Sequence, residues 1–87
     1  TMDGGDGSDT ADYSAEAQDL IVDLDGANFV NVADGGGTPI DLIRNIENFI
    51  GGSGNDLLIG DDANNRIEGR DGEDGLAGGA GDDVLKG

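Results

Sequence analysis

The sequence predicts an all-β fold, a right-handed parallel β-roll of nine-residue repeats with an irregular or antiparallel cap on its N-terminal side. Three observations predict it. From residue 51 onward, glycine opens every ninth position, an apolar residue fills the eighth place of each unit, and Asp or Asn fills the sixth. A fixed period of this kind is typical of stacked-repeat architectures. Two units, 18 residues, would complete one coil, and coils would stack about 4.8 Å apart.

Four units in unbroken register make up residues 51–86: GGSGNDLLI, GDDANNRIE, GRDGEDGLA and GGAGDDVLK. In each unit, the first six residues predict a turn, because glycine permits backbone angles that a Cβ would penalise. The last three predict a short strand whose central side chain points to one face. These central residues are Leu58, Ile67, Leu76 and Leu85. We expect them to meet between two facing sheets.

We divide the chain into an N-terminal segment, residues 1–50, and a repeat array, residues 51–87. The segment holds one further unit, GGDGSDTAD from Gly4, which is out of phase with the array. Alternation with a period of two predicts strands in the segment. The expected elements are a turn of helix in 13–19, strands around 20–24 and 30–32, a break in 34–39, and a longer strand over 43–50. Because Gly87 opens a unit that does not follow, we expect a longer parent polypeptide.

Composition excludes several classes of function. Twenty acidic residues stand against four basic ones, and the net charge is −16. A surface this acidic repels nucleic acid. No apolar run is long enough for a membrane span. The chain has neither Cys nor His, so it has no disulfide, thiolate zinc site or histidine base. Small domains with a thin core recruit disulfides, metals or partners, which leaves a metal as the leading candidate.

The stacking of turns explains why a metal is needed. Turns two units apart would lie on each other, 51–56 on 69–74 and 60–65 on 78–83. Asp56 and Asp74 would then be neighbours, and unit charges 4 Å apart repel by roughly 4 kcal/mol at an effective dielectric of about 20. A hard cation converts this repulsion into ligation. Carbonyl-rich turns favour calcium over magnesium, which keeps its waters. No EF-hand loop is present in the sequence.

The units GGSGNDLLI and GGAGDDVLK resemble the nonapeptide of the RTX, or haemolysin-type, calcium-binding repeat family, whose consensus is GGxGxDxUx. The resemblance covers residues 51–87 and extends to 4–14. It implies a parallel β-roll that binds several calcium ions between its turns. It also implies a secreted bacterial protein that is exported unfolded through a type I system and folds in external calcium.

The resemblance further implies a set of ligands. Its sixth-position side chains are Asp56, Asp74, Asp83 and Asp9. The remaining ligands that it implies lie in the same turns, largely as backbone carbonyls: Gly51, Ser53, Asn55, Gly69, Asp71, Glu73, Gly78, Ala80, Asp82, Gly4, Asp6 and Ser8.

Departures from the consensus modify these expectations. The second unit lacks two glycines and has Asn65 in the sixth place, so we expect the site between 60–65 and 78–83 to be weaker, or to borrow Asp61 or Asp62. The strongest site should lie between 51–56 and 69–74, although Arg70 replaces a glycine there. For the turn Gly4–Asp9, the expected partner is Gly36–Asp41.

We therefore expect a non-catalytic, calcium-binding module of a larger secreted bacterial protein, whose partners are calcium ions and the rest of that polypeptide. Two other classes of function stay open. One is an accessory polysaccharide-binding module of an extracellular carbohydrate-active enzyme, for which only Arg44, Arg66, Arg70 and Lys86 could supply basic charge. The other is a structural spacer of a surface adhesin, in which rolls would self-associate end to end.

Overall fold

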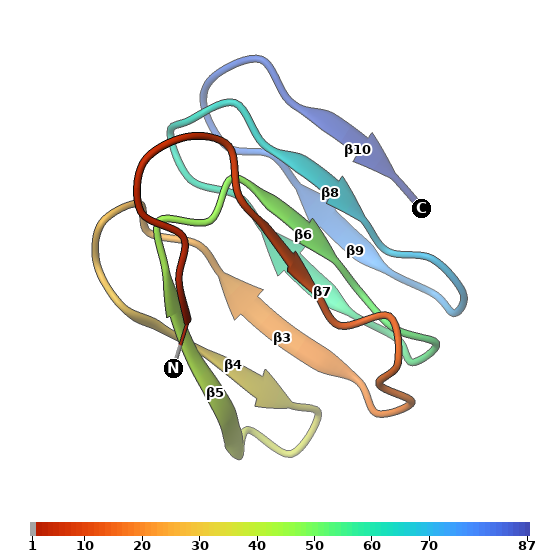
Figure 1. Cartoon of the computed structure of the whole chain (residues 1–87). Coiled ribbons are helices and arrows are strands. Elements are labelled where there is room, and N and C mark those ends of the chain that lie inside the picture. The colour runs from red at the N-terminus through yellow and green to blue at the C-terminus, as the bar shows by residue number, and fades with distance from the viewer. Residues whose placement is uncertain (1) are drawn as a thin grey trace.

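The computed structural model describes residues 2–87 as ten strands in two sheets, with no helix among these residues (Figure 1). An all-β fold is therefore confirmed, and the described residues include no helix that could cross a membrane. The strands are β1 (Met2–Asp3), β2 (Thr10–Asp12), β3 (Leu20–Asp23), β4 (Val30–Asp34), β5 (Pro39–Arg44), β6 (Asn48–Ile50), β7 (Leu57–Ile59), β8 (Arg66–Glu68), β9 (Gly75–Ala77) and β10 (Val84–Lys86).

Consecutive strands of the array alternate between the two sheets. The smaller sheet has the order β10-β8-β6-β2, and the larger sheet has the order β1-β5-β4-β3-β7-β9. Within each sheet, array strands pair in parallel with a shift of 18 residues, so that Leu58 lies beside Leu76 and Ile67 beside Leu85. The 18-residue register expected for the coil is observed.

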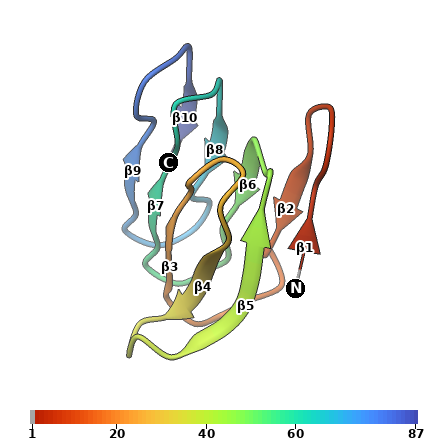
Figure 2. The same cartoon turned by 90° about the vertical axis from the view of Figure 1, so that its left-hand side faces the viewer.

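Strands of the N-terminal segment extend the same two sheets. β2 pairs in parallel with β6, and β3 pairs in parallel with β7. β4 runs antiparallel to both β3 and β5, so the larger sheet is mixed and the pairing is not parallel throughout. Figure 2 shows β4 and β5 curving away from the array, with β1 and β2 beyond them on the side opposite β9 and β10.

Apolar side chains between the sheets form one core. Leu58 and Ile67, both in the eighth place of a unit, are fully buried, as are Phe49 and Val22 on the strands beside them. Leu85 occupies the same place but is 44% exposed, because β10 is the edge of its sheet. Burial of the apolar column thus decreases toward the last repeat.

Two predictions about the N-terminal segment are wrong. The strand expected over 43–50 is two strands, β5 and β6, separated by a turn in which Asn45 has φ of 54°. Asn tolerates this left-handed conformation, and its N–H donates to the carbonyl of Gly26. Residues 13–19 contain no helical turn. A hydrogen bond from Glu16 N–H to Tyr13 O closes a single β-turn. The backbone otherwise bonds to β6 and to the array: Tyr13 N–H donates to Ile50 O, and Glu16 O accepts from Ser53 N–H.

Tyr13 fixes the start of this irregular segment. Its ring stacks on Phe49, with 5.2 Å between ring centroids, and its hydroxyl donates to Asp41 Oδ2 at 2.6 Å. Burial, reinforced by the hydrogen bond to Asp41, raises the pKa of the Tyr13 hydroxyl. The segment between β2 and β3 is therefore attached to both the core and β5.

Candidate metal centre

The turns of the array stack as the sequence predicts. Turn 51–56 lies on turn 69–74: Asp56 N–H donates to Asp74 Oδ1 at 2.8 Å, and Glu73 N–H donates to Asn55 Oδ1 at 2.8 Å. Turn 60–65 lies on turn 78–83 through the same two bonds: Asn65 N–H to Asp83 Oδ1 and Asp82 N–H to Asn64 Oδ1, both at 2.8 Å. Fifth- and sixth-position side chains thus connect successive coils.

The sixth-position carboxylates of Asp56, Asp74 and Asp83 are held in the same way. One oxygen accepts the N–H of the coil before, and the other packs over the first glycine of its own turn. Asp9 likewise packs its Oδ2 over Gly4, the first glycine of its turn. At Gly51, for example, an added methyl group would lie 2.5 Å from Asp56 Oδ2. These inner oxygens of Asp9, Asp56 and Asp74 are buried and have no hydrogen-bond partner among the described residues. Such orphaned carboxylate oxygens are where a hard cation would bind.

The buried carboxylate of Asp56 carries an electrostatic cost. It is 2% exposed. Burial raises the pKa of its carboxyl, the Leu20 N–H opposes this rise through a hydrogen bond of 2.9 Å, and the charge of Asp74 adds to it. A cation between these turns would remove both the burial penalty and the repulsion.

Backbone carbonyls supply the other oxygens around the turns. The described residues contain no cluster of three or more Asp, Glu, His or Cys side chains that could hold a metal ion. A cation at these turns would therefore depend on carbonyl oxygens, as the implied ligand set requires. Of the implied ligands, the exposed ones are Ser53, Asn55, Asp62, Asp71, Glu73, Ala80, Asp82, Asp6 and Ser8. The first-position glycines Gly51 and Gly69 are buried, and Gly78 and Gly4 are partly buried.

Close approach between coils explains the glycines of the first unit. A methyl group at Gly52 would overlap the carbonyl oxygen of Glu16, and one at Gly54 would lie 2.6 Å from that of Gln18. Neither glycine has a positive φ. The corresponding residues of the second unit, Asp61 and Ala63, also lack a positive φ. The second unit can depart from the consensus because its backbone there does not require glycine.

The third unit keeps the turn conformation without its second glycine. Arg70 has φ of 65°, close to the 76° of Gly79 in the fourth unit, and Gly72 and Gly81 have φ of 94° and 88°. The third and fourth turns therefore share one backbone shape. Arg70 adopts the left-handed conformation despite its steric cost, so arginine in place of glycine does not disrupt the stack of turns.

The partner predicted for turn 4–9 is wrong. Residues 35–38 form the β4–β5 hairpin turn, in which Asp34 N–H donates to Thr38 O at 2.9 Å, and Asp41 lies within β5. Turn 4–9 stacks instead on the short β5–β6 turn, Asn45–Glu47. Asp9 N–H donates to Glu47 Oε1 at 2.9 Å, and Asp9 O accepts the N–H of Asn48. The parallel pairs β1–β5 and β2–β6 dictate this neighbour.

One further turn-like layer, residues 15–20, was not predicted from the sequence. Residues 15–20 lie on turn 51–56: Asp19 Oδ1 accepts Asn55 N–H at 2.7 Å, as Asn55 Oδ1 accepts from Glu73. The signal in the sequence that could have found this layer is its position in the nine-residue repeat. Counting back from Gly51 in nines places residue 15 at the start of a unit and Val22 in its apolar eighth place. The segment lacks the glycines and the sixth-position acid that would have drawn attention to it.

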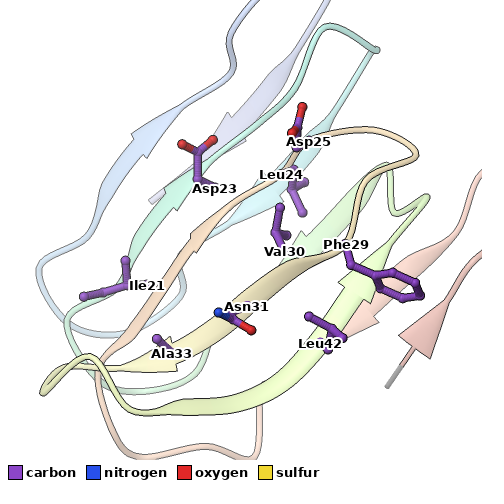
Figure 3. A pocket seen from close by; sticks show the side chains of 9 residues that line it. All are labelled: Ile21, Asp23, Leu24, Asp25, Phe29, Val30, Asn31, Ala33 and Leu42. Atoms are coloured by element: carbon purple, nitrogen blue, oxygen red, sulfur yellow. The ribbon is translucent and has the colours of Figure 1, made fainter.

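A separate cavity of about 640 Å³ lies on the hairpin side of the larger sheet (Figure 3). Phe29, Leu42 and Ile21 line it together with the carboxylates of Asp23 and Asp25. Its lining includes no basic side chain and none of the repeat turns. It therefore offers no complement to an acidic polymer.

Comparison with known proteins agrees with the turns just described. Residues 50–85 match the model of the RTX calcium-binding nonapeptide repeat in four copies. The chain is also similar to serralysins over 58 residues: 47% identity with those of Photorhabdus laumondii subsp. laumondii and Photorhabdus luminescens, and 43% with that of Proteus mirabilis. The matched part is 64% of this chain and 12% of each serralysin. Residues 50–85 therefore belong to the RTX family of calcium-binding nonapeptide repeats.

Proposed function

We propose that the chain is a calcium-binding module of a larger secreted bacterial protein and that it folds into a β-roll when it binds calcium outside the cell. The observation that carries the proposal is the row of buried carboxylate oxygens without a hydrogen-bond partner, at Asp9, Asp56 and Asp74. The ligands proposed are these side chains, Asp83, and the carbonyls of the stacked turns. Residues 1–50 would cap the array of residues 51–87 at one end.

Charge and core size support coupling between folding and binding. A net charge of −16 on 87 residues destabilises any compact state through self-repulsion. Among the described residues, the core has only ten buried apolar residues, and one of them is an alanine. Each calcium site filled at about 100 times its dissociation constant would add ~2.7 kcal/mol of stability. Two or three sites would therefore decide whether the chain folds.

The serralysin similarity supports secretion, because the RTX repeats and these relatives both suggest a secreted bacterial protein. A polysaccharide-binding role receives less support from the surface. Arg44 pairs with Asp3 at 2.9 Å and lies over the Phe29 ring, and Arg66 contacts Glu68 at 3.2 Å. Half of the basic side chains that such a role would use are thus already engaged.

Far-UV circular dichroism in chelator, followed by separate calcium and magnesium titrations, tests the proposal. We expect a coil spectrum in chelator that becomes strand-rich with calcium and not with magnesium. Equilibrium dialysis would count the bound ions. A full strand spectrum in chelator, or an unchanged coil spectrum in millimolar calcium, would contradict coupled folding.

A further inference from the structure

The first unit of the array carries apolar side chains at positions that the repeat does not require to be apolar. Its seventh and ninth places point away from the core, on either side of the buried Leu58. These places hold Leu57 and Ile59, whereas in the next unit they hold Arg66 and Glu68. The nonapeptide consensus leaves both places free, so the repeat pattern does not account for the apolar pair.

Strand pairing extends this apolar surface over four strands of the larger sheet. Ile21 of β3 lies beside Leu57 of β7 and beside Ala33 of β4, so these three side chains share the outer face of the sheet. Leu42 of β5 lies beside Asn31 of β4, and both line the same cavity as Ile21 and Ala33 (Figure 3). Ile21 and Leu57 are 40% and 46% exposed. A continuous exposed apolar surface of this kind is typical of an interaction site.

The cavity of about 640 Å³ on this face combines apolar walls with negative charge. Phe29, which is 42% exposed, lines it together with the carboxylates of Asp23 and Asp25. Neither carboxylate forms an ion pair with a described residue. Arg44 lies over the Phe29 ring at 4.3 Å, but it is paired with Asp3. The face therefore complements a partner that is both apolar and cationic.

The topology of the sheet decides how such a partner would bind. β3, β4, β5 and β7 are each paired on both sides, so a partner cannot add a strand to them. It would instead pack on the face of the sheet, as an α-helix does with one apolar stripe. Four strands about 4.8 Å apart span about 14 Å, which a helix of about ten residues crosses at about 1.5 Å per residue.

We infer that the outer face of the larger sheet binds a cationic amphipathic helix of a separate polypeptide, whose apolar stripe covers Ile21 and Leu57. Its Lys or Arg side chains pair with Asp23 and Asp25. The inference goes beyond the proposed calcium function and involves none of the stacked turns. A net charge of −16 attracts a cationic partner and accelerates its encounter. The same charge opposes a second copy of this chain and an anionic lipid surface.

Fluorescence anisotropy with a labelled peptide of about 14 Leu and Lys residues, with Leu at helical spacing, tests the inference. One control peptide has the same composition in scrambled order, which keeps the charge and removes the apolar stripe. The other has Glu in place of Lys, which keeps the stripe and reverses the charge. In calcium, with circular dichroism recorded on the same samples, the amphipathic cationic peptide should bind about tenfold more tightly than either control.

Variants of the chain locate the binding surface. Ile21→Thr should weaken binding of the cationic peptide about fivefold, because it removes apolar contact area from the face. Val84→Thr is the matched control, since Val84 is also β-branched, is 57% exposed and lies on β10 of the smaller sheet. Asp23→Asn should weaken binding about threefold through the loss of one ion pair. Asp12→Asn removes the same charge from an exposed position of β2 and should leave binding unchanged.

The outcomes separate the inference from the proposed function. Equal binding of the amphipathic and scrambled peptides, or an equal loss in Asp23→Asn and Asp12→Asn, would indicate attraction by net charge alone; either result overturns the inference and leaves the calcium function standing. Pelleting of the chain with phosphatidylcholine vesicles in calcium, if lost in Ile21→Thr, would assign the face to a lipid surface and also overturns it.

Folding in the absence of calcium distinguishes the two proposals in the other direction. A chain that is strand-rich in chelator and binds the cationic peptide there overturns coupled folding and supports the inference. A chain that stays a coil in calcium overturns both, because the apolar face exists only in the folded sheet.

Discussion

Asp56 and Asn65 occupy the sixth place of consecutive units and are both 2% exposed. Their neighbours differ, because Asp56 faces a hydrogen-bond donor and Asn65 faces an acceptor. Asp56 Oδ1 accepts a hydrogen bond from the N–H of Leu20, in the layer before it. Asn65 faces the shortened Asn45–Glu47 turn and donates its amide to Glu47 O at 3.0 Å. A carboxylate could not make that bond. The departure from the consensus at residue 65 is therefore explained by the neighbouring turn.

Restoring the consensus at this place should destabilise the chain. In Asn65→Asp, a buried carboxylate would face the Glu47 carbonyl without a donor, at an expected cost of about 1–3 kcal/mol in the free energy of unfolding. Urea denaturation in saturating calcium measures it. Asn64→Asp is the control, because Asn64 is exposed and uses its side-chain oxygen as an acceptor. Equal or greater stability of Asn65→Asp would show that the amide bond is unimportant.

Neutralising Asp56 should separate its effect as a buried charge from its effect as a calcium ligand. Asp56→Asn removes a buried charge, so in chelator the variant should be more structured than the parent, while its calcium midpoint should rise at least tenfold. Calcium-titrated circular dichroism reads both effects. Asp23→Asn removes the same charge from an exposed strand position and should change the midpoint little. An unchanged midpoint in Asp56→Asn would exclude Asp56 as a ligand.

The pKa of Asp56 predicts how the calcium-free fold responds to acid. Burial raises this pKa, so the protonated form favours the folded state. The stability that this residue contributes is present below its unfolded pKa of 3.8 and is lost as pH rises through the folded value. In chelator, strand content should therefore increase between pH 7 and about pH 4.5, and less so in Asp56→Asn. A decrease in strand content on acidification would contradict this sign.

At the scale of single elements, the spacing between coils limits the turns more than backbone angle does. Gly37, in the β4–β5 hairpin turn, and Gly72, in a stacked turn, have similar φ of 85° and 94°. A methyl group at Gly37 would meet nothing within 4 Å, whereas one at Gly72 would overlap the carbonyl oxygen of Gly54. A comparison of Gly37 with Gly72 therefore distinguishes the backbone strain of a positive φ from the steric effect of a neighbouring coil.

Alanine at both positions should show that difference. Each substitution carries the left-handed penalty of about 1–2 kcal/mol, and Gly72→Ala should lose about 1–3 kcal/mol more through overpacking against the next coil. Urea midpoints in calcium give both values. If the two variants are equally destabilised, the coils can separate to accommodate a methyl group and the stack is looser than described.

For the whole molecule, the net charge of −16 makes stability depend on cations. Raising sodium chloride from about 10 mM to about 0.5 M shortens the Debye length from ~30 Å to a few ångströms, which weakens repulsion between exposed carboxylates. Such screening does not reach buried oxygens such as Asp56 Oδ2. We therefore expect salt in chelator to recover only part of the strand signal that calcium produces. Full recovery by sodium chloride would mean that calcium acts by screening alone.

Much of the architecture could be predicted, because each position of the repeat has a fixed place in the coil. The apolar eighth place predicted the buried Leu58 and Ile67, and the nine-residue spacing predicted the 18-residue register. The same pattern did not predict that Leu85 is 44% exposed, because exposure depends on whether another strand lies beyond β10. Local patterns also failed in residues 13–19, where hydrogen bonds to a turn 36 residues later determine the backbone.

The repeat pattern alone was enough to predict the all-β class, the coil period, the stacking of 51–56 on 69–74 and of 60–65 on 78–83, and the oxygen-rich chemistry of the turns. Each of these follows from residues nine or 18 apart, which a repeat places together. Three further features became visible in the folded chain alone: turn 4–9 lies on Asn45–Glu47, residues 15–20 form a layer without any consensus residue, and an added methyl group at Gly5 or Gly7 would meet nothing within 4 Å. These contacts depend on the path of the β4–β5 hairpin, whose antiparallel pairing interrupts the repeat and shifts its phase.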